Sequence, residues 1–195
     1  MAIIEPGGNA AVGDVSPEQL GYPDPNYLHY VPSPLRYFYW GFAWPRVRRH
    51  HVFLDLGCGK GRIVYAAGRR RFARVTGVEL SAGLAAQARD NLASQARHLR
   101  CANVEVVTAD VTEYRIADDV THVYLYNPFI GETFDVAITH IIQSLDRRPR
   151  KIRLLYVNPV MHVELMATGR FRELRRLRLA RQPDLLRTAV LYEGA

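Results

Sequence analysis

The stretch Asp55-Leu56-Gly57-Cys58-Gly59-Lys60-Gly61 decides the fold, because it joins an apolar strand to a helix. Val52-Phe53-Leu54 predicts a short buried strand, and residues 60–70 predict a helix that is entered through glycine. Such a turn lets a ligand approach the backbone and meet the helix N-terminus. In doubly wound sheets, ligands bind beyond the carboxyl ends of the strands. The stretch therefore predicts a ligand site at the end of the first strand.

The spacing of the glycines argues against two common nucleotide-binding turns. A dinucleotide-binding turn requires Gly-x-Gly-x-x-Gly or Ala, but Arg62 occupies the third position. A P-loop requires Ser or Thr after Gly-Lys, whereas Gly61 follows Lys60. Glu79 closes the next predicted strand about twenty residues further on, where a carboxylate can accept hydrogen bonds from both hydroxyls of a ribose.

Strands and helices alternate after the glycine turn, which predicts an α/β protein with a doubly wound, mostly parallel sheet. Ser81 is expected to cap a helix that carries an apolar stripe from Leu84 to Leu99. Further strands are predicted at 74–80, 103–108, 121–126, 152–157, 171–179 and 187–193, and the clearest helix at 132–146. Residues 180–186 are too few for a parallel crossover, because such a connection needs about a dozen residues. The last strand of the seven is therefore expected to be antiparallel.

Three segments are expected along the chain. Residues 1–20 are rich in Gly, Pro and Ala and predict a mobile tail. Residues 21–50 predict an aromatic cap, in which a helix starts at Pro34, runs through Trp40 and ends before Pro45. Residues 51–195 form the main domain. Tyr27, Tyr30 and Tyr37 of the cap are expected to line a lid or an aromatic cage, or to pack against the sheet edge.

The composition predicts an ordinary globular protein of the cytoplasm. The N-terminus lacks the pattern of a signal peptide, and no apolar run is long enough to span a bilayer. Cys58 and Cys101 are too few for a disulfide scaffold, and no group of residues has the spacing of a metal site. We therefore expect no membrane partner and no metal, and the sequence does not indicate an oligomeric state.

The net charge of +7 makes nucleic acid a possible partner, although not the favoured one. Arginine supplies nearly all of the positive charge, because Lys60 and Lys151 are the only lysines. The arginines lie in short scattered groups, which is also the pattern of a solvated basic surface.

Asp-x-Gly-x-Gly-x-Gly at 55–61, with Glu79 and Asp110 after the next two strands, resembles class I S-adenosylmethionine-dependent methyltransferases. The resemblance spans residues 50–193 and includes the antiparallel last strand. It implies a Rossmann-like fold and S-adenosylmethionine as the cofactor. In such a site, Gly57 and Gly59 would approach the methionine and ribose, Asp55 would organise the ammonium group, Glu79 would bind the ribose hydroxyls and Asp110 the adenine amino group. The expected cofactor-binding residues are Asp55, Gly57, Cys58, Gly59, Gly61, Glu79, Leu80, Asp110, Val111 and Asn127.

The acceptor site is expected at Tyr126-Asn127-Pro128-Phe129, where the fourth strand ends beside the first. This corner resembles the Asn/Asp-Pro-Pro-Tyr/Phe motif of methyltransferases that act on amino groups, but it lacks the second proline. Asn127, Pro128 and Phe129 are therefore the candidate catalytic residues. The alternative is a rigid strand exit in which Asn127 caps a turn. Tyr156-Val157-Asn158-Pro159 repeats the Asn-Pro pattern at the end of the fifth strand.

The favoured function is methyl transfer to a small molecule or a protein side chain, with nitrogen preferred over oxygen. The alternatives are an RNA or DNA methyltransferase and a non-catalytic partner subunit that binds the cofactor. His162 and His29 are candidate bases, though each is expected to be an ordinary surface histidine. Cys58 is interpreted as a packing residue.

Overall fold

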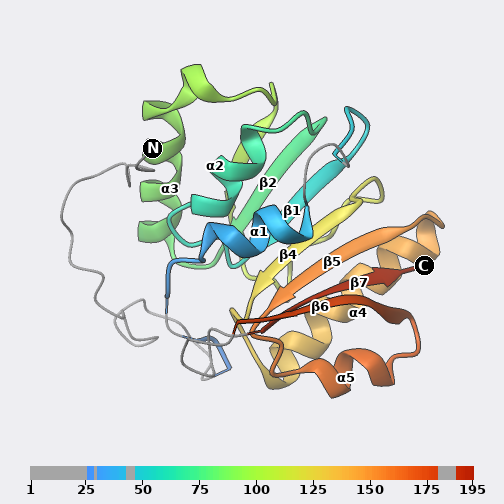
Figure 1. Cartoon of the computed structure of the whole chain (residues 1–195). Coiled ribbons are helices and arrows are strands. Elements are labelled where there is room, and N and C mark those ends of the chain that lie inside the picture. Colours follow the sequence, from blue (N-terminus) through green and yellow to red (C-terminus); the bar gives the residue numbers. More distant parts are fainter. Residues whose placement is uncertain (1–25, 29, 43–46, 180–187) are drawn as a thin grey trace.

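The computed structural model describes residues 26–28, 30–42, 47–179 and 188–195. In this part of the chain a seven-stranded sheet has the order β3-β2-β1-β4-β5-β7-β6 (Figure 1). The predicted tail at 1–20 lies outside the described residues, and so does Pro45, the predicted end of the first helix.

The elements follow the predicted alternation. The strands are β1 Val52–Leu56, β2 Arg74–Glu79, β3 Val104–Thr108, β4 His122–Tyr126, β5 Ile152–Val157, β6 Phe171–Arg178 and β7 Thr188–Gly194. The helices are α1 Leu35–Gly41, α2 Arg62–Gly68, α3 Ala82–Ser94, α4 Gly131–Arg147 and α5 His162–Ala167, with a short 3-10 helix at Ala96–His98.

The pairing of the strands confirms the predicted sheet. β3, β2, β1, β4 and β5 pair in parallel, whereas β7 is antiparallel to both β5 and β6. The strand order changes direction between β1 and β4, so the loops after these two strands leave the same edge of the sheet at the switch point.

Two local features differ from the prediction. The stripe that begins at Leu84 does not continue as one helix to Leu99, because α3 ends at Ser94 and a 3-10 turn follows. α5 was not predicted at all, since Leu165 is its only buried residue and six residues cannot show a repeating apolar stripe. The predicted cap of α3 is confirmed, because the Ser81 hydroxyl accepts a hydrogen bond from the Leu84 amide.

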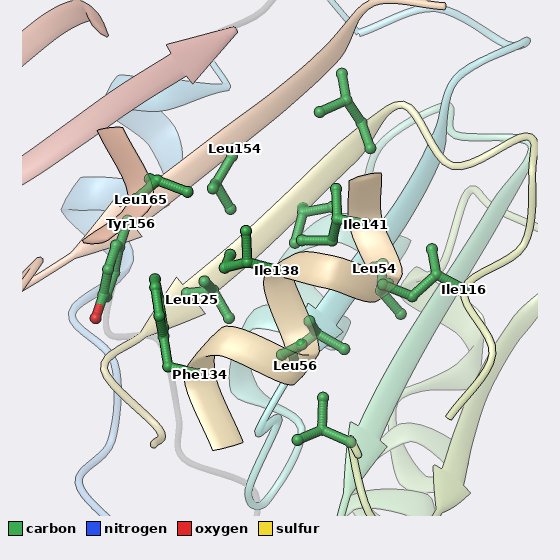
Figure 2. Packing of buried hydrophobic residues seen from close by; sticks show 14 of the residues in the cluster. Leu54, Leu56, Ile116, Leu125, Phe134, Ile138, Ile141, Leu154, Tyr156 and Leu165 are labelled. Carbon is green, nitrogen blue, oxygen red and sulfur yellow. The ribbon is translucent and has the colours of Figure 1, made fainter. Parts of the chain in front are cut away.

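Helices cover both faces of the sheet (Figure 1). α1, α2 and α3 pack on one face, where their buried residues share a cluster with Phe53, Tyr124 and Leu155. α4 and α5 cover the other face, and Figure 2 shows the apolar stripe of α4 packed there. This stripe contains Phe134, Ile138 and Ile141, which pack against Leu54, Leu56, Leu125, Leu154 and Tyr156. The two buried layers hold the carboxyl ends of the strands in fixed register.

Among the described residues, no helix combines the length and the apolar character needed to cross a bilayer. The same part of the chain contains no group of three or more His, Cys, Asp or Glu side chains placed to hold a metal ion.

A buried histidine makes the stability of the fold depend on pH. His122 at the start of β4 is 7% exposed, and its ring packs against those of Phe42, His51 and Phe72. Burial, with the nearby His51 and Arg153, lowers the pKa of His122 to about 3. The unfolded chain binds a proton near pH 6.5 that the folded chain does not, so the free energy of unfolding falls as the pH drops from about 6.5 towards 3.

We expect this one proton to cost at most about 1.4 kcal/mol for each pH unit in that window. Urea unfolding of the wild type and His122→Phe between pH 4.5 and 7 measures the effect as the difference between the two curves. Since other groups titrate equally in both proteins, identical slopes in the two proteins would disprove the assignment to His122.

Candidate active site

The glycine turn follows β1 and is hydrogen-bonded to the end of β2. The amides of Gly57 and Cys58 both donate to the Val78 carbonyl, at 2.9 and 3.0 Å. Gly57 and Gly59 have φ angles of 77° and 52°, in the left-handed region that side chains disfavour. A Cβ at Gly57 would lie 2.4 Å from the Cβ of Pro128, and one at Gly59 would lie 2.2 Å from the Tyr30 ring. The turn therefore needs glycine both for its backbone and for its close neighbours.

Gly61 and Cys58 are buried packing residues of the turn. Gly61 precedes α2 and packs closely on α3, because a Cβ there would lie 3.0 Å from that of Ala88. The Cys58 side chain is buried above Gly77. Burial, together with the charges of Asp55 and Glu79, raises the pKa of the Cys58 thiol well above its usual value. This agrees with the interpretation of Cys58 as a packing residue, since a nucleophile needs a lowered pKa.

Two buried carboxylates lie beside the turn. Asp55 in β1 is 3% exposed, and burial followed by the charge of Glu79 raises its pKa well above the usual value. Glu79 at the end of β2 is equally buried, and its two oxygens accept from the Gly59 amide at 2.8 Å and the Ser81 amide at 2.9 Å. A carboxylate can accept about four hydrogen bonds, so these two backbone donors fix its orientation without exhausting its accepting capacity.

Asp110 lies after the third strand, one position beyond Ala109. Its Oδ1 accepts three hydrogen bonds: from the Tyr27 hydroxyl at 2.5 Å, the Thr112 amide at 2.8 Å and the Thr112 hydroxyl at 2.6 Å. The two bonds from Thr112 form a local turn of the kind that an aspartate at the end of a strand commonly makes. The bond from Tyr27 comes from a distant part of the chain, and the turn alone does not account for it.

The Asn-Pro-Phe corner follows β4. Asn127 has a φ angle of 43°, and its Oδ1 accepts from the Tyr156 hydroxyl at 3.1 Å. Phe129 is 1% exposed, and its ring meets that of Tyr27 edge-on at 6.2 Å. Asn158, at the end of the neighbouring strand β5, repeats the left-handed conformation with a φ angle of 51°. Asparagine tolerates this conformation better than most residues, which explains why it stands at both corners.

The N-terminal segment crosses this corner. The Leu28 amide donates to the Pro128 carbonyl at 3.0 Å, and the Ile130 amide donates to the Asn26 carbonyl at 2.8 Å. Tyr27 and Phe129 thereby form an antiparallel bridge between the segment and the corner. The segment is thus tied to the corner by its backbone as well as by its side chains.

A cavity lies between the turn, the corner and this segment. Of the predicted site residues, those that line the cavity are Asp55, Gly57, Cys58, Glu79, Leu80, Val111, Pro128 and Phe129. Gly59, Gly61, Asp110 and Asn127 are not among its lining residues, although Gly59 and Asp110 bond directly to residues that are. The segment contributes Tyr27, Leu28, Tyr30, Val31, Pro32 and Ser33. Tyr37 is instead fully buried in the core, so the aromatic cap both covers the site and packs on the sheet.

Sequence reasoning missed several residues of the cavity wall. Arg62 was noted only as a departure from a dinucleotide turn, yet it lines the cavity. Tyr126 also lines it, and burial raises its pKa to about 12, so its hydroxyl stays protonated. Tyr126 belongs to the predicted acceptor stretch 126–129, but the sequence assigned it no role of its own.

The two candidate histidines differ in what the structure describes. His162 lies in α5 with Nδ1 2.7 Å from the Tyr192 hydroxyl, and it is not part of the cavity wall. His29 lies outside the described residues.

The sequence matches one known protein family over the region that contains this site. Residues 53–151, just over half of the sequence, match the model of a methyltransferase domain. The chain belongs to this methyltransferase domain family. The matched region contains the glycine turn, both buried carboxylates and the Asn-Pro-Phe corner. Family membership and strand order together confirm the expected class I, S-adenosylmethionine-dependent methyltransferase.

Solved structures share the fold of this methyltransferase. An RNA methyltransferase from Salinibacter ruber, in complex with S-adenosyl-L-homocysteine, has 24% identity, covers 84% of this chain and 92% of its own, and has a TM-score of 0.59. The N-methyltransferase NodS from Bradyrhizobium japonicum, also with S-adenosyl-L-homocysteine, has 13% identity, coverage of 74% and 78%, and a TM-score of 0.55. No curated protein matches the sequence. At these identities the likeness shows the fold alone.

Proposed function

We propose that this methyltransferase transfers the methyl group of S-adenosylmethionine to a nitrogen atom of a small molecule or a protein side chain. One observation carries the proposal: the glycine turn with its buried carboxylates and the Pro128-Phe129 corner line the same cavity. The cofactor residues and the acceptor residues expected from the sequence are therefore neighbours in space.

The residues of the cavity fit the cofactor. Gly57 leaves backbone exposed where a side chain would collide, and the buried Asp55 and Glu79 offer carboxylates to an ammonium group and to ribose hydroxyls. Leu80 and Val111 supply apolar walls for a purine near Asp110. A positive ammonium group beside Asp55 would favour its ionised form, which burial alone disfavours. S-adenosylmethionine supplies a methyl group that its sulfonium already activates.

The chain's own residues then have to place the acceptor and exclude water. Correct placement of a nucleophile supplies much of the rate of such a transfer. Tyr27, Tyr126 and Phe129 form an aromatic wall suited to a flat amine, and the N-terminal segment shields the cavity from solvent. The Tyr126 hydroxyl stays protonated and so does not act as a base. We therefore expect an amine to reach the site already neutral.

Asn127 is expected from the sequence both to contact the cofactor and to hold the acceptor, and its substitution distinguishes these two roles. We expect Asn127→Ala to retain binding of S-adenosylhomocysteine and to lower the rate of transfer at least hundredfold, because the acceptor corner loses its polar side chain. The matched control is Asn158→Ala, which removes an asparagine of the same left-handed conformation from the next strand end. Transfer of labelled methyl groups to candidate amines and proteins, followed by mass spectrometry, measures the rate. If Asn127→Ala lost the binding of S-adenosylhomocysteine together with methyl transfer, the acceptor site would lie elsewhere.

A nucleic-acid acceptor is the second candidate, since the net charge is +7 and one structural neighbour is an RNA methyltransferase. It predicts that binding of RNA or DNA weakens steeply with salt, because neutralised phosphates release counterions. Binding without a salt dependence, or no binding, would exclude it.

A further inference from the structure

Tyr27 lines the cavity and contacts both Asp110 and Phe129. Its hydroxyl donates to Asp110 Oδ1 at 2.5 Å, and Val111, the residue after Asp110, lines the cavity. Its ring lies against Phe129, and its backbone is bridged to the same residue. Tyr27 is only 6% exposed and Phe129 is buried, whereas Asp110 is half-buried, so the hydrogen bond between Tyr27 and Asp110 is partly shielded from solvent. One side chain thus connects the carboxylate after the third strand with the acceptor corner.

The hydrogen bonds of Asp110 restrict how its carboxylate can turn. The Tyr27 hydroxyl approaches from the N-terminal segment, while the two donors of Thr112 approach from the adjacent turn. All three donors meet the same oxygen, Oδ1. Hydrogen bonds to an ionised group are stronger than neutral ones, so donors from two directions hold the carboxylate plane in one orientation.

We propose that Tyr27 is a positioning residue that orients Asp110 and thereby sets the preference of the pocket for a purine with a 6-amino group. The inference rests on the proposed function, with Asp110 in the role that the family resemblance implies for it, as the acceptor of a hydrogen bond from that amino group. A carboxylate held in place offers its oxygen to the amino group at little entropic cost, whereas one free to rotate must be ordered by the ligand. The ring of Tyr27 meanwhile keeps the N-terminal segment on Phe129, so the purine end of the cavity and the acceptor corner are closed by the same residue.

Tyr27→Phe tests the inference, because it removes the hydroxyl and leaves the ring on Phe129. Calorimetry should compare S-adenosylhomocysteine with S-inosylhomocysteine, in which an oxygen replaces the 6-amino group. We expect the wild type to prefer the adenosyl compound by about tenfold or more, the usual value of one hydrogen bond to a charged group. In Tyr27→Phe the preference should fall at least threefold. Tyr39→Phe, which removes a hydroxyl from α1 outside the cavity wall, should keep it.

Each other outcome has a distinct meaning. An unchanged preference in a folded Tyr27→Phe would overturn the inference, and so would tighter binding of S-adenosylhomocysteine, because Tyr27 would then compete with the purine. A wild type that binds both compounds equally would show that Asp110 does not read the amino group, which also overturns it. A wild type that binds neither would refute the proposed function itself. A purely structural role for Tyr27 would weaken both compounds equally and leave their ratio unchanged.

Discussion

Glu79→Gln is expected to lose at least tenfold in affinity for S-adenosylhomocysteine and to unfold at a lower temperature than the wild type. Both effects have the same origin. The buried carboxylate accepts from the amides of Gly59 and Ser81, and it is the group expected to bind the ribose hydroxyls. An amide has one accepting oxygen, so its NH2 group would face one of these backbone donors. An unsatisfied buried donor costs about 1–3 kcal/mol, and each kcal/mol lowers the melting temperature of a chain of this size by about 2–4 °C.

The matched control is Glu105→Gln. Glu105 lies on β3, accepts from the Thr76 hydroxyl at 2.9 Å and is exposed, outside the cavity wall. We expect its substitution to leave affinity unchanged and to shift the melting temperature little. Affinities should be measured by calorimetry at a temperature at which both variants are folded. If Glu79→Gln bound the ligand as the wild type does, the role of Glu79 would be confined to holding the glycine turn.

Gly57→Ala is expected to abolish detectable methyl transfer and to lower the affinity for S-adenosylhomocysteine at least tenfold. The new Cβ would lie 2.4 Å from the Cβ of Pro128, which belongs to a rigid ring, so the turn or the acceptor corner must move. The φ angle of 77° adds about 1–2 kcal/mol of backbone strain for any residue with a side chain. Gly57 belongs to the cofactor-binding turn and Pro128 to the acceptor corner. One added methyl group between them should therefore disturb both parts of the site.

Gly169→Ala separates the strain from the collision. Gly169 has a φ angle of 66°, but a Cβ there would meet no atom within 4 Å. This variant should lose stability by the backbone cost alone and keep both affinity and transfer. If Gly57→Ala behaved like Gly169→Ala in binding and transfer, close contact between the turn and Pro128 would be irrelevant to function.

The sequence predicts the frame of the protein well because its signals are local. Glycine spacing at 55–61, the serine cap at Ser81 and the apolar stripe of α4 each follow from neighbouring residues, and the structure confirms the elements they predict. The short connection at 180–186 was enough to predict the antiparallel β7 from the length of chain that a crossover needs.

The parts that could not be predicted depend on contacts between distant segments. No local pattern reveals that Tyr27 reaches Asp110, that Leu28 pairs with Pro128 or that Tyr156 holds Asn127. The same holds for the two backbone amides that donate to Glu79. A carboxylate at a strand end predicts a ligand contact, but it does not predict which groups of the protein will hold that carboxylate in place. Sequence reasoning identified residues of the site, whereas the structure supplied the interactions that orient them.

Thermal unfolding in the presence of S-adenosylmethionine, S-adenosylhomocysteine and NAD tests the central claim most directly. A ligand that binds only the native state raises the melting temperature by mass action. We predict a clear rise with the first two compounds and none with NAD, and Glu79→Gln should reduce the rise. Stabilisation by NAD alone, or by none of the three, would contradict the assignment of this cavity to the methyl donor.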